Sequence, residues 1–191
     1  MLNSFRQHIQ KYQTISDEQF EAILSYFEVH SLKKKEIIQE AGQTQLYNYF
    51  VLEGCLRMYT LHEKGQEITT DFALESWWLC DQKAYLGKIE TDCYIQAVEN
   101  CKIIRISRDK EQLLIKEQPF IQFYFLQIYQ KAFAAAQFRN KLFKLYSKEE
   151  IFIQFNNNFP DFVQRVPQYL IASYLGLTPE YLSEIRKKIF S

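Results

Sequence analysis

The stretch PQYLIASYLGLTPEYLSEIRKK, residues 167–188, contains two short helical patterns on either side of Gly176. The apolar side chains at helical spacing are Ile171 and Leu175 before the glycine and Leu182 and Ile185 after it. Gly176 can adopt the positive φ that ends a helix, and Thr178 followed by Pro179 is typical of a helix start. The stretch therefore predicts a helix, a tight turn and a second helix.

The second of these helices leaves a polar face when its apolar side chains point inward. The residues on this face and its flanks are Thr178, Glu180, Ser183, Glu184, Arg186, Lys187 and Lys188. A helix presented in this way fits the major groove of double-stranded DNA, where side chains near its N-terminus reach base edges. The alternative is an antiparallel helical pair that only closes a domain and keeps its polar face in water.

The composition is that of a globular protein with an unevenly distributed charge. The chain has 191 residues, of which 47% are hydrophobic and 24% charged, and its formal net charge is zero. Residues 1–136 carry 15 basic and 18 acidic side chains, whereas residues 137–191 carry 8 and 5. A basic C-terminal part is compatible with contacts to phosphates. The sequence shows no membrane span or signal peptide, so we expect a cytoplasmic protein without a membrane partner.

The cysteines and histidines do not form a recognisable ligand motif. Cys55, Cys80, Cys93 and Cys101 include no C-x-x-C pair, and the three histidines lie far apart in the sequence. Buried free thiols are the favoured interpretation, and an iron–sulfur or zinc site is the alternative. We therefore predict no metal ion.

The chain before the long helical segments predicts one helix followed by a β-roll. Ser16 and Gln19 form a capping-box pattern at the start of an amphipathic segment. From Ser31 to Ile106, short runs rich in Ile, Val, Tyr, Phe and Thr alternate with turn residues, which is typical of a closed antiparallel roll or barrel. The clearest hairpin turn is residues 62–66.

Residues 119–146 predict one long helix with two adjacent apolar stripes, and so with two packing partners. The first partner is the β-roll of the same chain, and the second is the same helix of another subunit. The residues that we expect in this homodimer interface are Phe125, Ile128, Ala132, Ala135 and Leu142. The alternative is a helix that is buried within its own monomer.

The order of these parts resembles the Crp/Fnr family of bacterial transcription regulators. The resemblance rests on residues 33–59, KKKEIIQEAGQTQLYNYFVLEGCLRMY, and on residues 166–188 around Gly176. It implies an α+β fold with a cyclic-nucleotide-binding-like roll and N-terminal helices (1–118), a dimerisation helix (119–146) and a helix-turn-helix domain (147–191). It also implies double-stranded DNA, a second copy of the chain and RNA polymerase as partners.

The sequence departs from the nucleotide-binding relatives in the region that corresponds to their phosphate cassette. Residues 75–97 contain no arginine, although the cyclic phosphate in those relatives pairs with one. We therefore expect no cofactor and no response to cyclic AMP. A different ligand pocket would be lined by Glu75, Trp77, Trp78 and Lys83, and the alternative is that the two tryptophans pack in a core or an interface.

The helix that would read DNA departs from the family as well. Glu180 and Ser183 match the usual Glu-x-x-Ser-Arg pattern, but Glu184 stands in place of the arginine, and the chain ends at Ser191 without the β-hairpin wing. A ligand-sensing or interaction module that has lost DNA binding is therefore the alternative function. The sequence contains no nucleophile elbow, P-loop or dinucleotide-binding fingerprint, so we expect no enzymatic activity.

Overall fold

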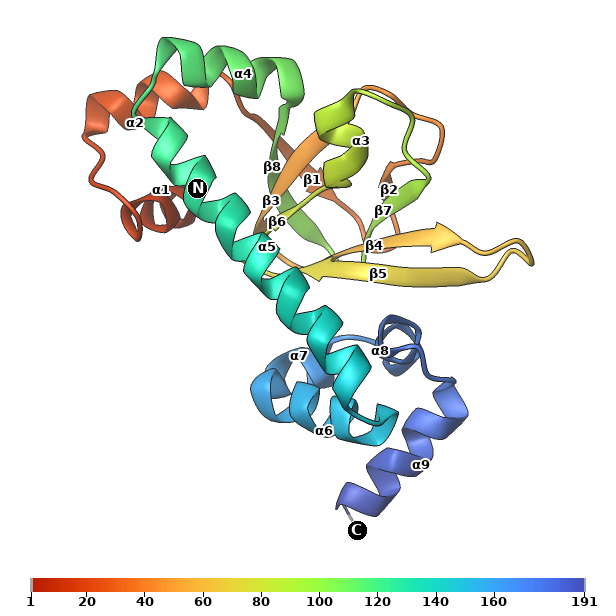
Figure 1. Ribbon diagram of the computed structural model, residues 1–191. Helices are drawn as coiled ribbons and strands as arrows, with labels where there is room; N and C mark the ends of the chain where they lie inside the picture. The colour runs from red at the N-terminus through yellow and green to blue at the C-terminus, as the bar shows by residue number, and fades with distance from the viewer. Residues whose placement is uncertain (1, 191) are drawn as a thin grey trace. The chain divides into compact units, whose positions relative to one another are not determined.

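The computed structural model describes residues 2–190 and divides into two compact units. The first unit runs up to Leu61 and resumes at Thr70–Gln130, and the second consists of His62–Thr69 and the residues from Lys131 onward. The two units are described separately (Figure 1).

The first unit contains two four-stranded antiparallel sheets. In spatial order, one sheet consists of β1 (Glu28–Leu32), β8 (Cys101–Ser107), β3 (Tyr47–Glu53) and β6 (Trp78–Leu79). The other consists of β2 (Ile37–Gln39), β7 (Cys93–Ala97), β4 (Leu56–Leu61) and β5 (Glu67–Ala73). Tyr49, Leu56 and Ile95 belong to one buried cluster to which both sheets contribute. The predicted β-roll is confirmed as an antiparallel β-sandwich.

Helices cover the outer face of the first sheet, as Figure 1 shows. They are α1 (Asn3–Gln10), α2 (Asp17–Leu24), α4 (Arg108–Glu117) and the first part of α5 (Ile121–Leu145). Phe5, Ile23 and Phe125 from these helices pack with Phe50 and Ile104 of the sheet. The capping box at Ser16 is confirmed, because its side chain accepts a hydrogen bond from the Gln19 amide and its own amide donates to the Gln19 side chain.

A short helix, α3 (Gln82–Gly87), interrupts the strands between β6 and β7. Asp81 is its N-cap, and the Asp81 carboxylate accepts a hydrogen bond of 3.2 Å from the Ala84 amide. The sequence did not predict this helix, since six residues are too few for a periodic pattern. The helix brings Asp81 to the start of β7, because the Thr91 hydroxyl donates to its other carboxylate oxygen at 2.8 Å.

The second unit is mainly helical. After the end of α5 it contains α6 (Lys148–Asn158), α7 (Pro160–Arg165), α8 (Gln168–Leu175) and α9 (Pro179–Phe190). Phe152, Ile171, Ala172, Leu182 and Ile185 are its fully buried apolar side chains. The long helix predicted over 119–146 is confirmed, and it runs from Ile121 to Leu145. With two sheets in the first unit and helices in both, the predicted α+β class is confirmed as well.

The turn between α8 and α9 depends on a left-handed backbone conformation. Gly176 has a φ of 66°, and the Leu177 amide donates to the Ala172 carbonyl at 2.8 Å. Leu177 then enters the core, and the Thr178 hydroxyl accepts a hydrogen bond of 3.2 Å from the Tyr181 amide. This cap fixes where α9 begins. Among residues 2–190, no helix is both long enough and apolar enough to cross a lipid bilayer.

Candidate functional site

The candidate DNA-binding residues lie along one solvent-facing side of α9 and at its start. Thr178, Glu180, Glu184, Lys187 and Lys188 are exposed, and Ser183 and Arg186 are half-buried. Leu182 and Ile185, on the opposite side of the helix, have no exposed surface. The structure therefore brings all seven predicted residues together on one helix, with an apolar face that holds the helix in place.

Basic and acidic groups alternate near this surface. The Lys188 ammonium lies 4.0 Å from the Glu149 carboxylate of α6. Lys148, at the start of α6, donates to the Gly176 carbonyl at 2.8 Å. This last contact ties α6 to the turn that positions α9, so the orientation of α9 depends on the helices behind it as well as on the turn.

The five predicted dimer residues on the long helix α5 fall into two groups that differ in their exposure to solvent. Phe125 and Ile128 are buried in the core of their own chain, where they pack with the helices and the first sheet. Ala132 and Ala135 are exposed, and Leu142 is half-buried. Other apolar side chains of α5 are exposed as well, with Phe133 at 65% and Phe138 at 56%. The exposed apolar surface of α5 that a second chain could cover therefore includes Leu126 at 48% as well as the side chains beyond Ile128.

The four predicted pocket residues have different surroundings. Trp78 packs in the core, and its indole N–H donates to the Tyr124 hydroxyl at 2.8 Å. Glu75 accepts a hydrogen bond of 2.8 Å from the Gly54 amide, and Lys83 is exposed. The side chain of Trp77, directly before β6, is exposed. Trp78 therefore has the core-packing role that was the alternative interpretation from the sequence.

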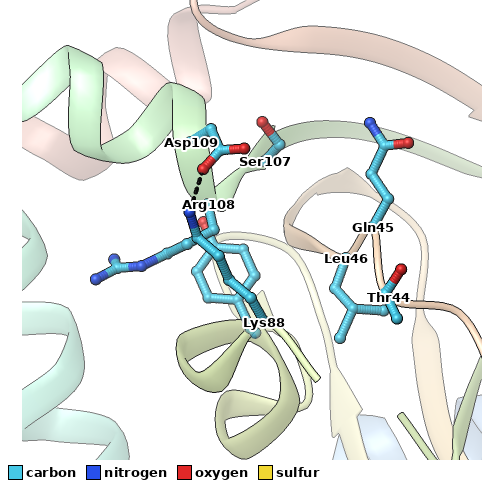
Figure 2. Close-up of a pocket in the computed structure, with 8 residues that line it drawn as sticks. Thr44, Gln45, Leu46, Lys88, Ser107, Arg108 and Asp109 are labelled. Atoms are coloured by element: carbon cyan, nitrogen blue, oxygen red, sulfur yellow. Dashed lines mark hydrogen bonds and ion pairs between the residues drawn. The ribbon is translucent and has the colours of Figure 1, made fainter. Parts of the chain in front are cut away.

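A cleft of about 310 Å³ lies elsewhere on the first unit, between α3 and the start of α4. Its lining residues are Thr44, Gln45, Leu46, Tyr85, Lys88, Ser107, Arg108 and Asp109. Figure 2 shows Lys88 directed at Asp109, with which it forms an ion pair, and the segment from Thr44 to Leu46 on the opposite side. The Arg108 guanidinium points away from that segment.

Behind this cleft lies a buried carboxylate, Glu111, that the sequence analysis did not identify. Glu111 has no exposed surface, and burial raises the pKa of its carboxyl group. It accepts hydrogen bonds from the hydroxyls of Tyr85 at 2.9 Å and Tyr129 at 2.9 and 3.0 Å, and it pairs with Arg108 at 2.7 Å. One side chain of α4 thus joins α3 to α5.

Comparison with known families agrees with this architecture. Residues 29–118 match the family model of the cyclic nucleotide-binding domain, and this range contains both sheets except for Glu28, together with α3 and α4. This segment is therefore similar to a cyclic nucleotide-binding domain. No curated protein sequence matches the chain.

Solved structures extend the likeness over both units. FixK2 from Bradyrhizobium japonicum is 17% identical, with a TM-score of 0.69, and the match covers 86% of this chain and 84% of that one. The c-di-GMP responsive global regulator CLP from Xanthomonas campestris is 10% identical, with a TM-score of 0.70 and 91% of each chain covered. The Catabolite Activator Protein of Thermus thermophilus is 18% identical, with a TM-score of 0.57, and 93% and 85% covered. The resemblance seen in the sequence is therefore confirmed at the level of the fold.

In the first unit, the segment between β6 and β7 carries acids. Asp81 caps α3 and accepts from Thr91, and Asp92 is exposed directly before Cys93. The Cys93 thiol donates to the Asp92 carboxylate at 3.3 Å. Sequence reasoning noted that arginine is missing here but did not identify these three side chains as neighbours, because Asp81 is remote from the other two along the chain.

Proposed function

We propose that this chain is a sequence-specific DNA-binding transcription regulator of the Crp/Fnr type that acts as a homodimer and does not respond to cyclic AMP. The observation that carries the proposal is the presentation of α9, whose apolar side is buried and whose polar side is exposed from Thr178 to Lys188. A fold shared along the chain with transcription regulators supports this interpretation.

The polar side of α9 offers two kinds of contact with a duplex. Glu180 and Ser183 lie in the N-terminal half of the helix, which enters the major groove most deeply in helix-turn-helix proteins. A glutamate accepts a hydrogen bond from cytosine N4, and a serine bonds to either a base or a phosphate. Arg186, Lys187 and Lys188 supply the sequence-independent attraction to the backbone.

A homodimer would supply the second copy of α9 that two half-sites about one helical turn apart require. The exposed apolar side chains of α5 beyond Ile128 support this part of the proposal. Phe133 and Phe138 are large aromatic groups, and covering them would remove apolar surface from water. RNA polymerase is a further proposed partner that follows only from the family resemblance.

The acidic segment between β6 and β7 supports the absence of a response to cyclic AMP. A cyclic phosphate bound near the N-terminus of α3 would face the Asp81 carboxylate, and arginine is absent from residues 75–97. Like charges at short range oppose binding, and the segment itself contributes no planar guanidinium to offset them. These residues do not fit a cyclic phosphate. Calorimetry that gives a micromolar dissociation constant for cyclic AMP would overturn this part.

Selection of bound sequences from a random DNA library by the purified chain tests the central proposal. We expect a two-fold symmetric site, and Glu180→Ala should lose about 1–3 kcal/mol at one base position of each half-site. Asp161→Ala is the control, because Asp161 is an exposed acid of the same unit that lies on α7. An equal loss on every sequence would contradict a base-reading role for Glu180.

The second candidate function is a module of the same fold that has lost DNA binding. Two exposed carboxylates, Glu180 and Glu184, on the short face of α9 favour it, because they repel phosphates. If the chain sediments as a stable dimer and yet enriches no DNA sequence, this result would support the alternative and reject the proposal of a DNA-binding regulator. Genome-wide mapping of bound sites would then separate the two functions in the cell.

A further inference from the structure

Three side chains that could hold a metal ion come together where α3 begins and β7 begins. One carboxylate oxygen of Asp81, one of Asp92 and the Sγ of Cys93 all lie within 4.8 Å of one another. A tetrahedral zinc ion with bonds of about 2.0–2.3 Å to oxygen and sulfur places its ligand atoms about 3–4 Å apart. Only a small contraction is therefore needed for the three atoms to share one ion.

Hydrogen bonds hold two of these ligands in a defined orientation. Asp81 Oδ1 accepts from the Ala84 amide at 3.2 Å, and Asp81 Oδ2 accepts from the Thr91 hydroxyl at 2.8 Å. The Thr91 oxygen in turn accepts from the Cys93 amide at 3.1 Å. Each carboxylate oxygen keeps a second lone pair for a metal ion. Such outer contacts are the usual means by which proteins orient metal ligands.

A buried amide oxygen without a partner provides the independent observation that points to a ligand. Gln39 is 1% exposed, and its Oε1 has no hydrogen-bond partner among residues 2–190. Gln39 pairs with Ile95 across β2 and β7, so its side chain lies on the same face as that of Cys93, two residues along β7. Its Nε2 donates to the Cys93 carbonyl at 3.4 Å, which places the amide beside this cysteine. The oxygen of this amide is therefore free to accept a further ligand beside Cys93.

The electrostatic surroundings favour a cation. Within the described part of the chain, neither Asp81 nor Asp92 forms an ion pair with a basic side chain. The two carboxylates therefore place negative charge that no basic side chain in that part of the chain neutralises beside the Cys93 sulfur.

We propose that Asp81, Asp92, Cys93 and Gln39 bind one divalent ion of the zinc type. On binding, the S–H bond of Cys93 breaks, its proton passes to the solvent, and a sulfur–metal bond forms. A thiolate in the ligand set selects zinc or cobalt over magnesium and calcium, which prefer oxygen ligands alone. The proposal departs from the sequence-based expectation of no metal ion, which considered only the spacing of cysteines and histidines. It does not depend on DNA binding.

Cobalt titration of the purified full-length chain, after removal of metals with a chelator, tests the site directly. We expect one equivalent of Co²⁺ to produce the thiolate-to-cobalt charge-transfer band and the visible bands of tetrahedral coordination, and Zn²⁺ to abolish both. Cys93→Ser should remove the charge-transfer band, whereas Cys55→Ser, which changes another buried thiol, should keep it. Absence of the band from the unaltered chain, or its persistence in Cys93→Ser, would overturn the proposal.

Asp92→Asn separates loss of binding from loss of folding, because Asp92 is exposed and its replacement leaves the core unchanged. We expect its affinity for Co²⁺ to fall about tenfold or more, with an unchanged thermal unfolding midpoint in the metal-free state. Glu90→Gln is the matched control, since it removes the same charge from an exposed position two residues away. Equal affinities of the two variants would contradict the assignment of Asp92 as a ligand.

Discussion

Single charged side chains in the first unit join elements that are far apart in the sequence. Glu28 of β1 accepts from Arg105 of β8 at 3.0 Å and from Lys110 of α4 at 2.8 Å. Glu111 connects α4 with both α3 and α5 through Tyr85 and Tyr129. The surroundings shift the pKa values of these two carboxyl groups in opposite directions. The two groups therefore change the pH dependence of stability differently.

Glu28 should stabilise the fold above pH 4.5 and lose its effect in acid. The hydrogen bond from Lys110, followed by that from Arg105, lowers the pKa of Glu28 from 4.5 to about 2. A lowered carboxyl pKa gives stability that is present above the unfolded value and disappears as the pH falls from about 4.5 to about 2. Because Glu28 is partly exposed, solvent screening limits the loss in Glu28→Gln to about 1 kcal/mol at pH 7.

Urea unfolding of Glu28→Gln and the unaltered chain at several pH values measures this difference. Glu21→Gln is the control, since Glu21 is exposed on α2 and should change the free energy of unfolding by less than about 0.5 kcal/mol. A deficit of Glu28→Gln that stays constant down to about pH 2 would rule out the ion pairs as its cause.

Tyr129→Phe should destabilise the chain by about 1–3 kcal/mol at neutral pH, because it removes a donor from a buried carboxylate. Burial raises the pKa of Glu111 above 4.5, so ionising it costs the folded state stability as the pH rises through that value. The tyrosine hydroxyls favour the ionised form, and the loss should therefore be smaller below pH 4.5.

Chemical denaturation at pH 4 and pH 7 distinguishes this effect from a simple loss of packing. Tyr146→Phe is the matched control, because Tyr146 directly follows the last residue of α5 and is exposed. We expect this control to change the free energy of unfolding by less than about 0.5 kcal/mol at either pH. A deficit of Tyr129→Phe that is equal at the two pH values would show that Glu111 is not involved.

At the level of elements, the turn between β3 and β4 is the tightest in the sandwich. Gly54 has a φ of 102°, and a Cβ there would lie 2.6 Å from Cys101 Sγ and 2.7 Å from the Asn100 carbonyl. Gly65, in the hairpin after β4, has a φ of 78° but nothing within 4 Å of a Cβ. A comparison of the two positions therefore distinguishes the cost of backbone strain from the cost of steric overlap.

Gly54→Ala should therefore cost about 2–4 kcal/mol, and Gly65→Ala only about 1 kcal/mol. Both variants incur the left-handed backbone strain, but only the first drives a methyl group into its neighbours. Thermal unfolding of the two variants, run side by side, measures the difference. Equal costs would indicate that the β3–β4 turn relaxes around the added carbon.

The elements that the sequence predicted correctly are those that local residues determine. Ser16 with Gln19 is sufficient to start α2, and Gly176 with Thr178 is sufficient to place the turn before α9. Strands were recognisable from runs of β-branched and aromatic residues. The six-residue helix α3 has too little periodicity to be detected, although Asp81 caps it in a recognisable way.

Contacts between remote residues account for what the sequence could not predict. The side chain of Tyr129 is 18 residues from Glu111, and Tyr85 is 26 residues from it, so no spacing rule links them. The two stripes of α5 were visible, but the assignment of Phe125 and Ile128 to the core of their own chain depends on α1, α2 and the first sheet. The roles of the DNA-binding residues stay predictions.

For the whole molecule, the proposed metal site and the proposed DNA-reading helix belong to different parts of the chain. The polar groups Asp81, Asp92, Cys93 and Glu111 are in the first unit, whereas α9 is in the second unit. Residues on both sides of the division at Gln130 belong to the same continuous helix, α5. A signal that alters Tyr129 therefore acts on the helix that also carries the proposed dimer surface.

Association through α5 should control DNA affinity, and Phe133→Glu tests this connection. Phe133 is 65% exposed in the single chain, so a charge there leaves the monomer folded but would be buried in the proposed dimer. We expect sedimentation to show a monomer at micromolar concentration, with a loss of affinity for a two-fold symmetric site of about 100-fold or more. Gln122→Glu adds the same charge at an exposed polar position of α5 and should leave both measurements unchanged. A monomeric Phe133→Glu that binds the full site as tightly as the unaltered chain would show that each α9 reads DNA independently, and a dimeric one would place the interface elsewhere.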